Sequence, residues 1–130
     1  MKILFASMPA TGHLNPLLAI TRMLLAEGHE ITFLTGSAFR ARIESSGAKF
    51  VSLPMGADLA GRDLLSLAPE LKDIPPGLEW VRVAIERIFV DAVPAEHQGL
   101  LQALQECQAD VIVGDDMFFG VLPMLDDDNV

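Results

Sequence analysis

Two side chains that can exchange protons follow apolar runs at opposite ends of the chain. His13 comes shortly after the run Ile3–Ala6, and Asp115 follows the run Val111–Val113. An imidazole can take a proton from a hydroxyl group, and a carboxylate bonded to its other nitrogen fixes the tautomer and stabilises the charged ring. Such general-base catalysis accelerates a reaction by about 10²–10⁴-fold. Together, His13 and Asp115 would form a general base whose tautomer is held by a carboxylate.

Structural roles for the same residues stay open at this point. A histidine near a turn commonly caps or packs against a helix, and an aspartate after a strand commonly caps the next helix. Asp116 adjoins Asp115 and competes with it as the partner of His13. Spacing alone does not choose among these readings.

The rest of the chain alternates between strand and helix patterns. Strands are predicted at 2–6, 30–35, 49–53 and 110–114, and helices at 15–27, near 39–43, at 78–93, 95–107 and 117–125. This order is typical of a Rossmann-like, doubly wound α/β fold, with helices on both faces of a parallel sheet. The first and fourth strands are neighbours in such a sheet. The loops after them, which carry His13 and Asp115, would then flank one crevice.

The first loop has residue types suited to a tight turn before a helix. Gly12 can adopt backbone angles that other residues avoid. Asn15 is expected to cap the helix, with Pro16 at its first position. His13 would then lie just ahead of the helix.

In the later helix at 78–93, we expect an inward face formed by Leu78, Val81, Ile85, Ile88 and Phe89.

Composition excludes several classes of function. The chain has 130 residues, is 51% hydrophobic and carries a net charge of −9, which argues for one domain (1–130) and against nucleic-acid or anionic-membrane partners. Its single cysteine, Cys107, rules out a disulfide framework and fits the cytoplasm. No apolar segment is long enough to span a bilayer. The first turn has one glycine, which disfavours a nicotinamide or flavin oxidoreductase and a phosphate-binding P-loop.

Three segments resemble one enzyme family. The Gly12-His13-Leu14-Asn15-Pro16 turn after Met-Lys-Ile-Leu-Phe-Ala is similar to the amino-terminal half of a GT-B glycosyltransferase. The matching families are the UDP-glycosyltransferases and the macrolide or antibiotic glycosyltransferases. The segments Glu27–Phe33 and Asp110–Asp115 resemble the second strand and the fourth strand of that domain. The likeness covers essentially the whole chain.

The resemblance implies a reaction and a set of site residues. His13 would deprotonate a hydroxyl of a small hydrophobic acceptor, and Asp115 would balance the charge on the ring. The oxygen would attack the anomeric carbon of a nucleotide sugar with inversion, without a metal or another cofactor. The residues expected to bind substrate are Gly12, Asn15, Met55, Trp80, Phe89, Met117 and Phe118.

The same resemblance predicts dependence on another domain. The carboxyl-terminal domain that binds the nucleotide sugar is missing from this sequence, so we expect the isolated chain to be inactive. It would need that domain or a partner chain. The alternative function is a non-catalytic interaction module. Such a module would self-associate through an apolar face that a partner normally covers.

Overall fold

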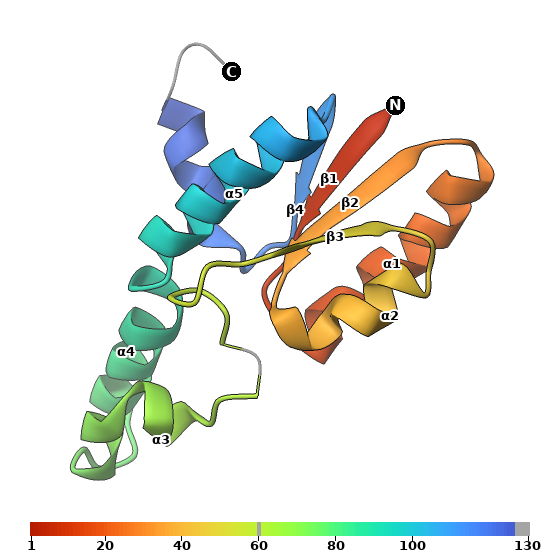
Figure 1. Cartoon of the computed structure of the whole chain (residues 1–130). Coiled ribbons are helices and arrows are strands. Elements are labelled where there is room, and N and C mark those ends of the chain that lie inside the picture. The colour runs from red at the N-terminus through yellow and green to blue at the C-terminus, as the bar shows by residue number, and fades with distance from the viewer. Residues whose placement is uncertain (60, 127–130) are drawn as a thin grey trace.

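A parallel sheet organises the molecule. The computed structural model describes residues 1–59 and 61–126, so the predicted domain at 1–130 extends beyond the described part. Its four strands have the order β3-β2-β1-β4 (Figure 1). All neighbouring pairs are parallel. The strands are β1 (Lys2–Ala6), β2 (Glu30–Thr35), β3 (Lys49–Ser52) and β4 (Val111–Gly114). The pairing of β1 with β4 is the one that the doubly wound topology predicts.

Helices cover both faces of this sheet, which confirms the predicted fold class (Figure 1). The α-helices are α1 (Thr11–Ala26), α2 (Arg40–Glu44), α3 (Leu64–Leu67), α4 (Leu78–Ile85) and α5 (Val93–Cys107). The short helices of other types are η1 (Ser37–Phe39), η2 (Pro69–Lys72), η3 (Glu86–Val90) and η4 (Phe119–Asp126). Helices α1 and α2 lie on one face, and α5 with η4 lies on the other. No helix in the described residues is both long and apolar enough to cross a membrane.

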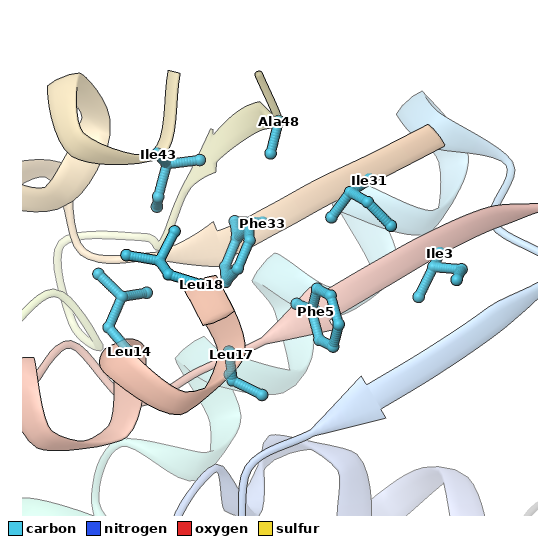
Figure 2. Packing of buried hydrophobic residues seen from close by; sticks show 9 residues of the cluster. All are labelled: Ile3, Phe5, Leu14, Leu17, Leu18, Ile31, Phe33, Ile43 and Ala48. Carbon is cyan, nitrogen blue, oxygen red and sulfur yellow. The ribbon is translucent and has the colours of Figure 1, made fainter. Parts of the chain in front are cut away.

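Each face of the sheet carries its own cluster of buried hydrophobic side chains. Phe5 and Phe33 of the sheet pack against Leu14, Leu18 and Ile43 of α1 and α2 (Figure 2). On the other face, a second cluster joins β1 and β2 to α5 and η4; it includes Leu4, Leu34, Leu100 and Phe118. Successive side chains of a strand point to opposite faces, so a strand buried on both faces is apolar at every position. This explains the unbroken apolar run in β1.

Residues 63–90 form a side lobe with a small core of its own (Figure 1). Ala68 and Leu71 pack there against Val83 and Ala84 of α4. The predicted inward face is wrong at Leu78, which is 90% exposed, and at Val81 and Ile85, which are also exposed. It is confirmed at Ile88, which packs against the lobe core, and at Phe89, which is half-buried. The α-helix also ends at Ile85, and a π-helix continues it. The predicted helix at 117–125 is the 3-10 helix η4, which contains Pro123.

Helix α1 begins earlier than its sequence predicts. Its N-cap is Ala10, and the backbone N–H groups of His13 and Leu14 both donate to the Ala10 carbonyl at 3.1 Å. Pro16 therefore lies inside the helix and His13 lies in its first turn. Gly12 does not use its conformational freedom, since it lies in the first turn of the helix. Gly28, with φ of 86°, follows the C-cap residue Glu27 and ends the helix.

Candidate functional site

The carboxyl ends of β1 and β4 bring two loops together. Ala6 at the end of β1 pairs with Gly114 at the end of β4. The Asp115 N–H donates to the Ala6 carbonyl at 3.0 Å and extends this ladder by one residue. The backbone of Asp115 is therefore fixed by the sheet, and His13 is fixed by the first turn of α1.

The structure places the side chains of His13 and Asp115 in direct contact. His13 Nδ1 lies 3.1 Å from Asp115 Oδ1, across 102 positions of sequence. A carboxylate only accepts hydrogen bonds, so we assign the proton of the neutral ring to Nδ1. His13 Nε2 has no partner among the described residues and is left with a free lone pair.

Backbone groups of both loops hold the Asp115 carboxylate. Its Oδ2 accepts the Met8 N–H at 2.6 Å, and its Oδ1 accepts the Met117 N–H at 2.8 Å. The side chain is only 7% exposed. Asp115 thus receives hydrogen bonds from three directions, which fixes the orientation of the carboxylate and of the ring beside it.

Asp116 holds a different position. One of its oxygens lies 3.8 Å from His13 Nδ1, and its side chain is 86% exposed. Of the two candidates, Asp115 is therefore the hydrogen-bonded partner. Ligand atoms of His13, Asp115 and Asp116 all lie within 4.8 Å of one another, a set that can hold a divalent cation. A cation there would compete with the Met8 and Met117 N–H groups for the Asp115 oxygens.

An open cavity of about 310 Å³ lies over this pair. It is lined by Gly12, His13, Pro16, Leu17, Asp115 and Asp116. A Cβ atom at Gly12 would meet no other atom within 4 Å, so the fold itself does not require glycine there. Apolar and acidic walls meet at the ring of His13, an arrangement suited to an apolar molecule that carries a hydroxyl group.

The other predicted site residues are dispersed. Asn15 accepts a hydrogen bond from Arg42 and lines a separate groove between α1 and α2. Phe118 is 1% exposed and belongs to the core, so the prediction that it lines a pocket is wrong. Met117 is exposed and reaches the site through its backbone. These three residues do not line the His13 cavity.

The remaining residues predicted to bind the acceptor, Met55, Trp80 and Phe89, lie apart from this cavity as well. Met55 is 80% exposed. Trp80 packs against the lobe core, and the Phe89 ring lies 5.9 Å from the Phe119 ring. Their role in binding an acceptor stays a prediction.

Sequence reasoning missed Glu96, a buried acid on α5. It is 4% exposed and accepts the Gly120 N–H at 2.8 Å. Burial raises the pKa of Glu96 to about 7, against the lowering effect of the Gly120 hydrogen bond; the nearby Asp115 charge adds to the rise. The signal was present in the helical spacing, because Glu96 shares the inward stripe of Leu100 and Ala103.

Two proteins that resemble this chain in sequence are named as a glucosyltransferase and as a synthase. UDP-glucosyltransferase B1 of Starmerella bombicola is 39% identical over 94% of this chain and 29% of its own length. The 4'-demethylrebeccamycin synthase of Lentzea aerocolonigenes is 29% identical over 92% of this chain and 28% of its own length. The chain thus spans less than a third of the relatives it matches.

Comparison with solved structures and with family models gives a consistent assignment. The crystal structure of the calicheamicin glycosyltransferase CalG4 superposes with a TM-score of 0.69 at 22% identity, over 95% of this chain and 29% of that one. The likeness shows a shared fold, that of the amino-terminal half of a GT-B glycosyltransferase. Residues 3–111 match the model of the glycosyltransferase family 28 N-terminal domain. The chain therefore belongs to the glycosyltransferase family 28 N-terminal domain family.

Proposed function

We propose that this chain is the acceptor-binding half of an inverting glycosyltransferase. In the reaction, a sugar passes from a nucleotide-sugar donor to a hydroxyl of a small hydrophobic acceptor of natural-product or antibiotic type. The observation that carries this proposal is the hydrogen bond between His13 Nδ1 and Asp115 Oδ1 beside an open cavity. It leaves His13 Nε2 available to a ligand.

Each residue of the pair has a separate task in the proposed reaction. His13 Nε2 takes the hydroxyl proton of the acceptor as the oxygen attacks the anomeric carbon. A new C–O bond forms there, and the bond from that carbon to the nucleoside diphosphate breaks with inversion. The diphosphate leaves with the electron pair of that bond. The Asp115 carboxylate stabilises the imidazolium through Nδ1–H, and no metal or cofactor takes part.

The donor is bound outside the described residues in this proposal. The Starmerella bombicola relative is named for a UDP-linked sugar, and this chain matches only 29% of its length. We assign the nucleotide sugar to a further domain or to a partner chain. The 130 residues alone are then expected to bind acceptor without transferring sugar.

A titration of the histidine ring signals tests the proposal. Acceptors from a panel of polyketide and flavonoid alcohols should shift the His13 signals, assigned with a His13→Ala variant, whereas uridine and thymidine diphosphates should not. His29 lies at the opposite edge of the sheet, where its ring contacts the Met1 amino group, and it serves as an internal control. If His13 stays silent to every acceptor, or responds strongly to a nucleotide alone, the assignment fails.

A second candidate function is a non-catalytic interaction module. Leu78, Val81 and Ile85 are exposed and share one stripe of α4. An uncovered apolar stripe of this kind favours association. Size-exclusion chromatography over a concentration series distinguishes a monomer from a self-associating chain.

We also infer a reducing setting, the cytoplasm, for the protein. Cys107 is a free, half-buried thiol, which is typical of proteins kept in reducing compartments. Cell fractionation with an antibody against the chain measures the location directly.

A further inference from the structure

Two consecutive residues of α5, Glu96 and His97, form hydrogen bonds with the backbone of Gly120 in η4. The Gly120 N–H donates to Glu96 Oε2 at 2.8 Å. The His97 ring nitrogen Nδ1 lies 3.0 Å from the Gly120 carbonyl oxygen and donates to it. Both polar groups of the Gly120 backbone are therefore bound by side chains of the same helix turn.

Gly120 also approaches α5 more closely than any other residue type would allow. A Cβ atom there would lie 2.4 Å from Glu96 Cβ and 2.8 Å from both the Glu96 carbonyl carbon and the His97 nitrogen. Two of these three atoms are backbone and cannot rotate away. The contact is thus built for glycine.

A short, ordered path leads from this contact to the candidate site. The Phe118 N–H donates to the Asp115 carbonyl at 3.1 Å and closes a turn. The Phe118 side chain is buried in the core, and the Phe119 ring packs against Phe89. The segment 115–120 is therefore held by β4 at its first residue and by α5 at its last.

We propose that Glu96, His97 and Gly120 form a positioning clamp that holds the segment 115–120 in the conformation in which Asp115 orients His13. This inference rests on the function proposed for His13. The clamp touches no reacting atom. It acts through Asp115, whose Oδ1 accepts both the Met117 N–H and the His13 ring hydrogen.

Amide hydrogen exchange and the His13 tautomer, both measured by NMR on the full chain, test the clamp. In Glu96→Ala, the Met117 amide should exchange about tenfold faster, because its acceptor is no longer held in place. The long-range ¹⁵N pattern of His13 should change from a fixed Nδ1–H tautomer to a mixture. Glu96→Gln retains an acceptor oxygen for Gly120 and should restore most of the wild-type pattern.

The matched control is Glu106→Ala, because Glu106 is an exposed acid on the same helix that accepts a hydrogen bond from Gln102 and lies away from η4. Protection of the β2 amides, for example Phe33, reports whether each variant is folded. If Glu96→Ala fails to fold, His97→Ala removes the other half of the clamp and supplies the same measurement. Wild-type exchange at Met117 and a wild-type His13 tautomer in a folded clamp variant would overturn the proposal.

The acceptor titration, repeated on these variants, separates the two proposals. If Glu96→Ala leaves Met117 exchange and the His13 tautomer unchanged while acceptors still shift His13, the clamp is refuted and the acceptor-binding function stands. If clamp variants disturb Met117 and His13 while acceptors leave wild-type His13 unchanged, the proposed function is refuted and the clamp stands as a support of the loop.

Discussion

At the scale of single residues, the site depends on how many donors point at one carboxylate. Two backbone N–H groups and the His13 ring converge on the two oxygens of Asp115. An isosteric amide cannot replace it, because an amide has one acceptor oxygen and a donating NH₂ group. At least one of the three donors would then face another donor.

Asp115→Asn is therefore expected to impair both catalysis and stability. In the complete enzyme kcat/KM should fall by about 10²–10⁴-fold, because the ring loses its fixed tautomer and its countercharge. The free energy of unfolding of the chain should fall by about 1–3 kcal/mol, the penalty for an unsatisfied buried donor. Steady-state kinetics and urea denaturation measure the two effects.

Asp116→Asn provides the matched control. Asp116 is exposed and lies farther from the ring, so its change should alter stability by less than about 0.5 kcal/mol. Equal losses in the two variants would show that the negative charge near His13, and not the hydrogen bond to Asp115, is what matters.

At the scale of elements, the packing of η4 on α5 places an acid where water is excluded. The pKa of Glu96 rises from 4.5 to about 7, so the folded chain binds a proton that the unfolded chain has already lost between these values. The stabilisation from this proton is complete below pH 4.5. It is lost as the pH rises through 7.

Wild type should accordingly lose stability relative to Glu96→Gln between pH 4.5 and pH 7.5. The expected difference is up to about 3 kcal/mol, from 1.36 kcal/mol for each pKa unit. Glu30, Glu70 and Glu79 have lowered pKa values because of their Lys or Arg partners, and they act in the opposite sense. They are common to both proteins and cancel in the difference. Thermal melts of both proteins across the pH range provide the measurement, and parallel curves would contradict the expectation.

The apolar stripe of α4 has its own expected outcome. Replacing Val81 and Ile85 by Lys should abolish any concentration-dependent association, because both side chains face solvent in the single chain. Light scattering at increasing concentration tests this. Lysine at the buried Val83 is the contrasting variant, and it should destabilise the lobe by several kcal/mol.

The sequence was informative where burial repeats along an element. The strands were predicted correctly because β1 is buried on both faces and reads as one apolar run. The face of α4 was not, because periodicity groups Leu78 with Val81 and Ile85 without saying which side another element covers. The start of α1 was misplaced for a related reason: its N-cap residue, Ala10, has no side chain that could bond to the first turn.

The site was partly predictable from the sequence for a similar physical reason. Parallel strands end at a common edge, so the topology alone placed the loops of His13 and Asp115 together. The Met8 and Met117 N–H bonds were not predictable, because they depend on local loop conformation. Asn15 was misassigned because Pro16 suggested a helix start, whereas Asn15 faces Arg42 on a different side of α1.

At the scale of the whole molecule, the chain corresponds to one domain of longer proteins. It matches the family's N-terminal domain and covers less than a third of the length of the Starmerella bombicola and Lentzea aerocolonigenes relatives. A complete reaction centre is expected only when a nucleotide-sugar site faces the cavity over His13.

Complementation is the matching experiment. Fusing this chain to the remaining part of the 39% identical relative should yield sugar transfer from a nucleotide sugar to an alcohol. The same fusion with His13→Ala should be at least about 10²-fold slower, as expected for loss of a general base. Product formation is followed by mass spectrometry. Full activity in the His13→Ala fusion would remove the base from the mechanism.

The pairing of β1 with β4 has a consequence for biosynthesis. On the ribosome, β1, β2 and β3 emerge within the first 52 residues and can pair at once, while one edge of β1 waits for residues 111–114. Pairing of this edge with β4 joins two segments that lie about a hundred residues apart in the chain, which is a slow, non-local step. His13 therefore lacks its carboxylate partner until residues 111–115 have been synthesised. The hydrogen bond between His13 and Asp115 can form only once β4 has docked beside β1.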